Sequence, residues 1–368
     1  MQIELPISKS IANRWLMLQA IHGDELMPVS DSMPDDVQIL HNALTTLRTF
    51  KTSKTSKTLS TPHIDVGNCG TAMRFLTAYC AQLDGQTVIL DGVERMCHRP
   101  IGQLVNTLRE IGADIEYLGE EGFPPLRIKG CILDKHRIVT INNPQSTQYI
   151  SALLLIGANV ITNSTSPYIY ITQEVIKQYQ LSPFSYHLSV EKDWSSAAFW
   201  YEYVALCGGE ITLPGLSRDS LQGDKVVADI FAHLGVHTEY TPEGITIAST
   251  GVADLQHSNL QGIDARSTAQ RSAEEILCQD FSACPDLYPA VALTCERLGI
   301  ELHATGVESL PLKESDRLRA VREHRTDADH RMAMALLVAG YEVEDTACIS
   351  KSYPQFIEQW KSVNTSNE

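Results

Sequence analysis

The chain has 368 residues, of which 43% are hydrophobic and 20% are charged, and its formal net charge is −16. This length exceeds what one hydrophobic core usually serves, so we expect two domains. The acidic balance excludes an overall basic protein of the kind that binds nucleic acid, so we expect no nucleic-acid partner. A local basic pocket for a small anionic ligand is still compatible with it.

The N-terminal stretch MQIELPISKS lacks the apolar core of a signal peptide, and no run approaches 18 apolar residues. The nine cysteines are scattered without CxxC spacing, and no His-x-x-x-His pattern accompanies them. We therefore expect a cytoplasmic protein with reduced cysteines, without membrane contact, bound metal or cofactor. We also expect a monomer.

One local pattern recurs six times along the chain. A polar or charged cluster precedes an apolar segment of about three helical turns, and a glycine follows. Ser, Thr, Asn and Asp are typical N-cap residues, and glycine is typical of the position just after a helix. Four segments are apolar on nearly all sides, so they should be buried helices. The six glycines are Gly23, Gly85, Gly157, Gly208, Gly299 and Gly340.

Amphipathic helices are expected between the buried ones. Two of them are followed by a glycine, a strand, a turn with acidic residues and glycine, and a second strand, over residues 108–130 and 231–251. This self-similarity predicts a repeated α/β unit. The amphipathic helices begin near Asp36, Pro100, Thr172, Leu221 and Glu314.

The other three amphipathic helices lack the hairpin. One is followed by a basic and polar stretch over 48–60, and another by the short stretch 182–190. After the third, the helix over 315–323 leads straight into the polar cluster over 324–331. We therefore expect that some of the repeats are abridged.

Basic side chains stand at the fronts of several predicted buried helices, where free amides already carry partial positive charge. Several such fronts in one cleft would bind phosphate and carboxylate groups, which arginine suits through its bidentate fork. The alternative is that each is a solvated surface charge. These residues are Lys9, Arg14, Arg74, His330 and Arg331, and short polar segments add Arg99, Lys313, Arg317 and Lys351.

Two acids close to these bases are candidates for acid–base chemistry. Asp286 precedes the fifth buried helix, where it could instead be only an N-cap. Glu314 lies in the segment LKESDR, where it could instead only neutralise Lys313. That segment could also be a ladder of ion pairs three or four residues apart, such as Lys313 with Asp316, the neighbour of Arg317.

Ten short motifs stand in order over nearly the whole chain: LPISKSIANRWL, GNCGTAMRFLTA, RMCHRPIGQL, QSTQYISALL, SPYI, DWSSAAFW, PDLYPAVAL, LKESDRL, DHRMAMAL and SKSYPQF. Together and in this order they resemble the EPSP synthases of the enolpyruvyl transferase family. The resemblance implies an α/β (α+β) fold of two similar domains, with six βαβαββ units around buried helices, some of them abridged here. It implies a first domain of residues 1–6 and 191–368, a second of residues 7–190, and an active site in the cleft between them.

The resemblance also implies a reaction of the shikimate pathway, which leads to chorismate and the aromatic amino acids. The enolpyruvyl group of phosphoenolpyruvate would move to the 5-hydroxyl of shikimate 3-phosphate, with release of phosphate. The path is addition and then elimination through a tetrahedral intermediate, without metal or redox cofactor. Asp286 would be the base, and Glu314 and Lys9 would move protons at the methylene carbon and the leaving phosphate.

The remaining site residues are assigned by the same resemblance. Shikimate 3-phosphate would be held by Lys9, Ser10, Arg14, Ser146, Thr147, Gln148, Thr165, Tyr168, Asp286, Ser309 and Lys313. Phosphoenolpyruvate would be held by Lys9, Gly70, Arg99, Gln148, Arg317, Arg331 and Lys351. The chain departs from the family's pattern at Cys69 (usually Ala), Thr147 (usually Ser) and Ser309 (usually Asn), and the register at Thr165 is open to its neighbours.

Two other functions stay open at this stage. An enolpyruvyl transferase acting on UDP-N-acetylglucosamine uses a loop cysteine, and Cys97 stands near Arg99, although RMCHRPIG follows the shikimate-type pattern. A non-catalytic relative that binds anions and has lost its hairpins would also fit the abridged repeats.

Overall fold

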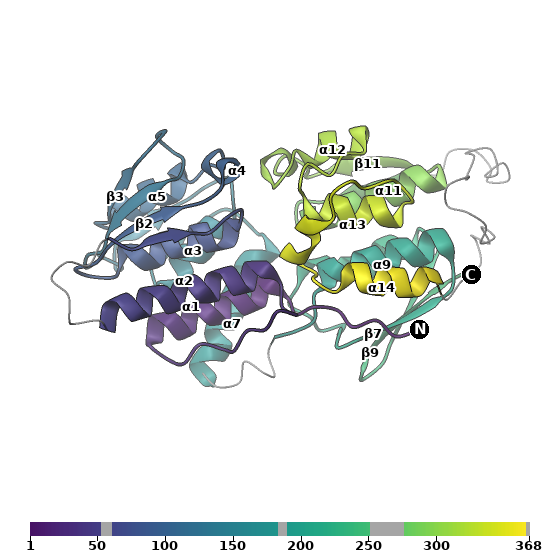
Figure 1. The fold of residues 1–368 in the computed structure, drawn as a ribbon, viewed down its shortest axis with the longest axis horizontal. Coiled ribbons are helices and arrows are strands. Elements are labelled where there is room, and N and C mark those ends of the chain that lie inside the picture. Colours follow the sequence, from purple (N-terminus) through teal and green to yellow (C-terminus); the bar gives the residue numbers. More distant parts are fainter. Residues whose placement is uncertain (53–60, 183–189, 251–275, 366–368) are drawn as a thin grey trace. The chain divides into compact units, whose positions relative to one another are not determined.

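The computed structural model describes residues 1–52, 61–182, 190–250 and 276–365 (Figure 1). The basic and polar stretch after the second helix and most of residues 182–190 therefore lie outside the described residues. The chain forms two compact units. The N-terminal unit holds Lys9–Asp31 and Asp35–Val190, and the C-terminal unit holds Met1–Ser8, Ser32–Pro34 and Glu191–Glu368.

The N-terminal unit contains a four-stranded sheet in the order β1-β2-β4-β3. Strands β1 and β2 pair in parallel on either side of the buried helix α3 in the chain, and β3 and β4 form the first predicted hairpin. The amphipathic helix α5 connects the two halves. The bounds are β1 His63–Asp65, α3 Gly70–Ala81, β2 Thr87–Asp91, α5 Gly102–Glu110, β3 Asp114–Tyr117 and β4 Leu126–Lys129.

A shorter repeat follows in the same unit. Strands β5 and β6 pair in parallel, with helix α6 between them in the chain, and no hairpin follows helix α7 within the described residues. Helix α1 packs against α2 and α7, and α6 packs against α3. The bounds are α1 Lys9–His22, α2 Asp35–Thr52, β5 Ile138–Thr140, α6 Gln148–Leu155, β6 Asn159–Ile161 and α7 Pro167–Leu181.

The C-terminal unit begins with a three-stranded antiparallel sheet in the order β7-β9-β8, which contains the second predicted hairpin. Gln2 forms a parallel bridge with Thr212 of β7, so the N-terminus extends this sheet. The buried helix α9 packs on the strands. The bounds are α9 Trp194–Cys207, β7 Glu210–Pro214, η1 Gly223–Val226, α10 Val227–Ala232, β8 Val236–Tyr240 and β9 Gly244–Ser249.

The rest of this unit is another short repeat. Strands β10 and β11 pair in parallel around the buried helix α11, and helices α12 and α13 follow. Residues 324–329 connect α12 directly to α13, so the predicted absence of a hairpin at this point is confirmed. The bounds are β10 Ile276–Asp280, α11 Tyr288–Leu298, β11 Glu301–Thr305, α12 Arg317–Glu323, α13 His330–Val338 and α14 Phe356–Thr365.

The six predicted buried helices are α1, α3, α6, α9, α11 and α13, and each ends shortly before its predicted glycine. All six glycines have a positive φ, between 68° and 81°. Residues with a Cβ rarely adopt this conformation, which explains why glycine stands at these positions. The repeated pattern of an apolar helix followed by glycine therefore predicts the positions of the six buried helices correctly.

Glu202 is an exception within the core, because it lies in α9 where every residue from Trp194 to Leu206 is buried. Its side chain is fully buried, and neither carboxylate oxygen has a hydrogen-bond partner among the residues that the structure describes. Burial raises the pKa of Glu202 well above its usual value. The contribution of Glu202 to the stability of the fold is therefore fully present at pH values below its pKa in the unfolded chain. It is lost as the pH rises through its pKa in the folded protein.

We expect Glu202→Met to raise the free energy of unfolding by about 1–3 kcal/mol at pH 8, because it removes an unsatisfied buried acceptor. The gain should shrink at pH 5, where the wild-type carboxyl keeps its proton. Urea unfolding at both pH values measures this. Glu210→Gln, at an exposed residue of β7, is the control. A loss of stability in Glu202→Met at both pH values would contradict the prediction.

Candidate active site

In the N-terminal unit, the first residue of α1 is paired with the first turn of α2. The Nζ of Lys9 lies 2.9 Å from Oδ2 of Asp36, which is buried. The backbone carbonyl of Asp36 accepts the thiol of Cys69 at 3.8 Å, and the Cys69 sulfur accepts the amide of Ala72 at 3.4 Å. Cys69 is therefore the N-cap of α3, and its thiol links the start of this helix to α2.

Two guanidinium groups lie beside the first residue of α3. A Cβ built on Gly70 would lie 2.6 Å from Nη2 of Arg99 and 2.9 Å from Nη1 of Arg74, so a larger residue would require these guanidinium groups to shift. Both arginines are buried, and in the described part of the chain neither forms a salt bridge with a carboxylate. Burial and the charge of Arg99 lower the pKa of Arg74 to about 10. Two adjacent buried cations of this kind favour an anionic ligand.

Arg14 joins three helices of the N-terminal unit. Its guanidinium donates to Oγ1 of Thr172 at 2.7 Å and to Oγ of Ser151 at 3.0 Å. It also donates to the backbone carbonyls of Ser10 and Tyr168, at 2.5 and 3.0 Å. Burial lowers the pKa of Arg14 to about 10. The structure thus places Arg14, Ser10 and Tyr168 together, while their contact with a substrate stays a prediction.

The start of α6 lies against the start of α3. Nε2 of Gln148 donates to Oγ1 of Thr71 at 2.9 Å, and Oγ of Ser146 accepts the amide of Gln148 at 3.3 Å. Thr147, the N-cap of α6, lies between them. Thr165 is exposed, and its neighbour Ser166 caps α7 through its hydroxyl, so the doubtful register at this segment stays open.

In the C-terminal unit, seven charged residues form one group that we call the ionic cluster. Asp286 is its centre: Oδ1 accepts Nη1 of Arg317 at 2.7 Å and Nζ of Lys313 at 3.4 Å, and Oδ2 lies 3.0 Å from Nη2 of Arg331. Because α11 begins at Tyr288 with Leu287 as its N-cap, the reading of Asp286 as an N-cap is wrong. The cluster consists of Asp286, Lys313, Glu314, Arg317, Asp329, Arg331 and Lys351.

Glu314 bridges two bases of the cluster, with Arg317 at 3.1 Å and Lys351 at 3.0 Å. The pair with Arg317 has the spacing of the predicted ion-pair ladder. Lys313, however, pairs with Asp286 across the fold, and Asp316 caps α12 by accepting the amide of Arg319 at 3.1 Å. Among the described ion pairs of this segment, the ladder therefore accounts for the one between Glu314 and Arg317. Ser309, half-buried, precedes the short helix η4 (Leu310–Leu312) without capping it.

Within the ionic cluster four bases face three carboxylates, and the buried acids Asp193 and Asp224 also act on Arg331. Burial raises the pKa of Asp286, but the charges of Arg331, Lys313 and Arg317 more than offset this, and the pKa lies well below its usual value. Nε and Nη1 of Arg331 are buried without a hydrogen-bond partner in the described ranges. Buried donors of this kind favour an anionic ligand.

Sequence reasoning missed a further buried acid near the cluster. Asp224, in η1, accepts a hydrogen bond from the hydroxyl of Ser195 at the start of α9. Burial and the charge of Asp286 raise its pKa to about 7. Asp224 stands in the segment LQGDKVV, where its acidity alone gave no signal, because the neighbours that perturb it are far away in the chain.

Cys97 does not have the surroundings of an activated nucleophile. Its thiol, at the end of α4 (Glu94–Cys97), lies 3.7 Å from the carbonyl oxygen of Gly92 and 3.9 Å from Oδ1 of Asp91. Burial and the charge of Asp91 raise the pKa of Cys97. A reactive cysteine needs a lowered pKa, so this geometry disfavours the reading based on the loop cysteine.

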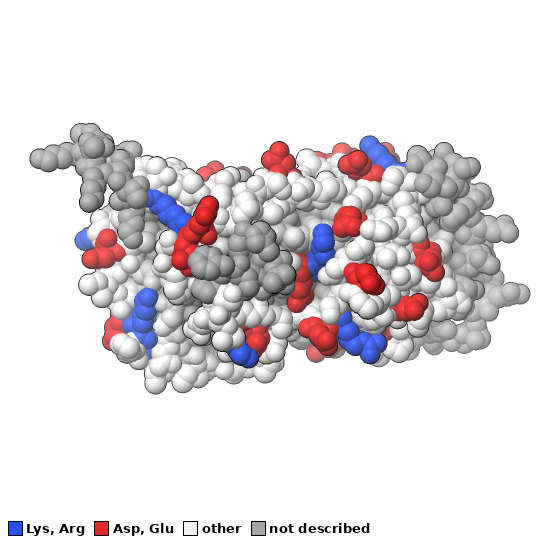
Figure 2. Space-filling view, turned by 90° about the horizontal axis from the view of Figure 1, so that it is seen from below, with Lys and Arg blue, Asp and Glu red and all other residues white. Residues whose placement is uncertain are grey.

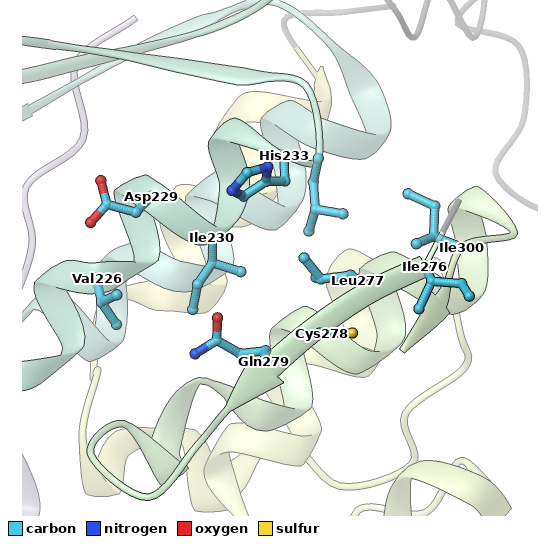
Figure 3. A pocket seen from close by; sticks show the side chains of 10 residues that line it. Val226, Asp229, Ile230, His233, Ile276, Leu277, Cys278, Gln279 and Ile300 are labelled. Atoms are coloured by element: carbon cyan, nitrogen blue, oxygen red, sulfur yellow. The ribbon is translucent and has the colours of Figure 1, made fainter. Parts of the chain in front are cut away.

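A cavity of about 500 Å³ lies elsewhere in the C-terminal unit, between α10 and β10 (Figure 3). None of the predicted site residues lines it, so it is distinct from the ionic cluster. The cavity is lined by Val226, Asp229, Ile230, His233, Leu234, Ile276, Leu277, Cys278, Gln279 and Ile300.

In the described ranges, no helix is long and apolar enough to cross a membrane. No three His, Cys, Asp or Glu side chains gather as a metal site in the same ranges.

The buried bases differ from those on the surface. Figure 2 shows one face of the protein, on which lysines and arginines lie singly among acidic side chains. In contrast, Arg14, Arg74, Arg99, Arg317 and Arg331 are each at most 8% exposed. The reading of these arginines as solvated surface charges is therefore wrong.

The family model and the individual relatives that match this chain point to the same protein family. The family model for EPSP synthase (3-phosphoshikimate 1-carboxyvinyltransferase) matches residues 1–182, 156–325 and 322–360. A 3-phosphoshikimate 1-carboxyvinyltransferase of Bacteroides fragilis is 36% identical over 416 residues, which cover 96% of this chain and 93% of the relative. One of Colwellia psychrerythraea is 29% identical and covers 99% of this chain and 96% of the relative. The first alignment is longer than the 368 residues of this chain, so the relative has segments without a counterpart here.

The fold comparison agrees with this result. A solved structure of the EPSP synthase from Acinetobacter baumannii matches with a TM-score of 0.62 at 19% sequence identity, covering 98% of this chain and 95% of that chain. At this identity the likeness concerns the fold, and the predicted enolpyruvyl transferase fold is confirmed. From the family model and the Bacteroides relative together, the chain belongs to the EPSP synthase (3-phosphoshikimate 1-carboxyvinyltransferase) family.

Proposed function

We propose that this chain transfers the enolpyruvyl group of phosphoenolpyruvate to the 5-hydroxyl of shikimate 3-phosphate and releases phosphate. The observation that carries the proposal is the ionic cluster, in which Asp286 is held by three buried or half-buried bases and two buried nitrogens of Arg331 have no hydrogen-bond partner in the described ranges. Both substrates carry a phosphate and a carboxylate. Such groups fit buried arginines that have donors to spare, as Arg331 has.

The first step would form a bond between the 5-oxygen of shikimate 3-phosphate and C2 of phosphoenolpyruvate. Asp286 takes the hydroxyl proton, and Glu314 or Lys9 gives a proton to the methylene carbon. When substrate anions bind the three bases around Asp286, their effect on its pKa weakens, so the carboxylate becomes a stronger base. In the second step, the bond between C2 and the phosphate oxygen breaks, and the methyl carbon returns a proton to Glu314 or Lys9, so that the carbon–carbon double bond forms again.

The bases divide between the two units. The N-terminal unit would contribute Lys9, Arg14 and Arg99, with Gly70 beside them, and the C-terminal unit would contribute the bases of the ionic cluster. That both sets act on one pair of substrates stays a prediction, as does the monomer that works without nucleic acid or membrane. Small-angle scattering with and without both substrates tests whether the units close on them.

Phosphate release tests the proposed function directly. We expect release only when phosphoenolpyruvate and shikimate 3-phosphate are both present, because the hydroxyl of the second attacks the first. Each substrate alone is the control. Release with UDP-N-acetylglucosamine in place of shikimate 3-phosphate would favour the sister transferase. Binding of both substrates without any release would favour the non-catalytic relative, whose only support is the abridged repeats.

A further inference from the structure

Asp329 is a carboxylate of the ionic cluster whose two oxygens accept four hydrogen bonds, although the family resemblance gave it no role. It is fully buried between α12 and α13. Its Oδ2 accepts Nε of Arg317 at 2.7 Å and the hydroxyl of Ser315 at 3.1 Å. Its Oδ1 accepts Nη2 of Arg317 at 3.3 Å and the backbone amide of Arg331 at 3.0 Å. One side chain thus forms a bidentate fork with one arginine and caps the helix that carries the other.

The chain reaches Asp329 through an unusual connection. Only residues 324–329 join α12 to α13, and three of them have a positive φ: His324 at 51°, Asp327 at 45° and Ala328 at 56°. Each costs on the order of 1–2 kcal/mol for a residue with a Cβ, so the surroundings must hold the turn. The amide of Arg325 donates to Ala320 at 2.9 Å, and the amide of Asp329 donates to Thr326 at 2.8 Å. The short turn therefore delivers Asp329 in one fixed position.

We propose that Asp329 is a positioning residue, which sets the spacing of the Arg317 and Arg331 guanidinium groups across the abridged connection. This rests on the proposed function, in which these two arginines hold phosphoenolpyruvate. Arg317 keeps Asp286 and Glu314 as partners at its Nη atoms, and Asp329 fixes its Nε edge and hence the plane of the fork. Without that carboxylate, the fork can rotate about its remaining contacts.

Asp329→Asn separates the fork from the cap, because asparagine is as good an N-cap as aspartate but carries no charge. We expect the KM for phosphoenolpyruvate to rise about tenfold to hundredfold, the range of a hydrogen bond to a charged group. The KM for shikimate 3-phosphate should change less than about threefold. The melting temperature should fall, because the buried ion pair with Arg317 is lost, so both KM values are measured well below it. Asp316→Asn, at the N-cap of α12, is the matched control and should leave both KM values unchanged.

The binding of inorganic phosphate, measured by calorimetry, makes the test independent of turnover. A wild type without phosphate release would refute the proposed function, while weaker phosphate binding by Asp329→Asn would still support positioning. Equal phosphate binding by both proteins, or equal rises in both KM values, would overturn the inference. If Asp329→Asn does not fold, Ser315→Ala is the second variant: it removes the hydroxyl that donates to Oδ2 of Asp329, keeps the charge and the cap, and should raise the KM for phosphoenolpyruvate in the same direction.

Discussion

Asp286→Asn should lower kcat for phosphate release by about 10²–10⁴-fold, the usual contribution of a general base. The amide has the shape of the carboxylate but takes no proton from the attacking hydroxyl. The change also removes a negative charge that faces Lys313, Arg317 and Arg331. Anions should therefore bind at least as tightly as in the wild type, and the KM for phosphoenolpyruvate should not rise.

Steady-state kinetics of phosphate release separate these two effects. Asp229→Asn, at an exposed residue of α10 outside the ionic cluster, is the matched control and should keep full turnover. A variant at Asp286 that keeps more than about a tenth of kcat would exclude it as the base. In that case Asp224, whose pKa of about 7 suits proton transfer at neutral pH, becomes the first candidate to test.

The helical framework could be predicted from sequence because its signals are local. A cap residue, an apolar run and a glycine with positive φ lie within about 20 residues of each other, so the periodicity located α1, α9 and α13 without knowledge of contacts. Two-residue alternation with an acidic turn located the β3–β4 and β8–β9 hairpins in the same way. These features depend on neighbours in the chain.

The pairings in the ionic cluster could not be predicted, because they join residues that are far apart. Lys313 was expected to pair within its own segment, yet its partner Asp286 lies 27 residues earlier. Asp286 was weighed as a cap because aspartate before a helix usually is one, but the 3₁₀ turn η3 (Pro285–Leu287) moves the helix start past it. Asp329 stands in front of a predicted buried helix, where aspartate is a typical N-cap. Its fork with Arg317 could not be predicted, because it depends on how short the connection between α12 and α13 is.

The abridged repeats bear on how the cluster is stabilised. The sheets β5–β6 and β10–β11 have two described strands each, whereas β1–β4 form a sheet of four. A short parallel pair contributes fewer backbone hydrogen bonds and less buried area than a full repeat. In the repeat that carries Arg317, no hairpin follows α12 within the described residues. Salt bridges between α12, α13 and η3 therefore stabilise this part of the fold.

Arg317→Ala should show how much these salt bridges stabilise the fold. We expect a loss of about 3–5 kcal/mol in the free energy of unfolding. The guanidinium is 1% exposed and pairs with Asp286, Glu314 and Asp329, so its removal leaves buried carboxylates without their shared partner. Burial lowers the pKa of Arg317, and these three carboxylates more than offset that effect, so the cation is strongly favoured in the fold.

Two further variants at α12 show whether burial is the cause. Arg317→Lys keeps a positive charge but loses the planar fork. Its free energy of unfolding should therefore lie between that of the wild type and that of Arg317→Ala. Arg319→Ala removes the exposed pair with Glu323 on the same helix and should leave the unfolding curve close to that of the wild type. Chemical denaturation with matched m-values measures all three. A loss below about 1 kcal/mol for Arg317→Ala would mean that its ion pairs contribute no more than surface pairs do. The abridged repeat would then depend on apolar packing of α12 and α13 instead.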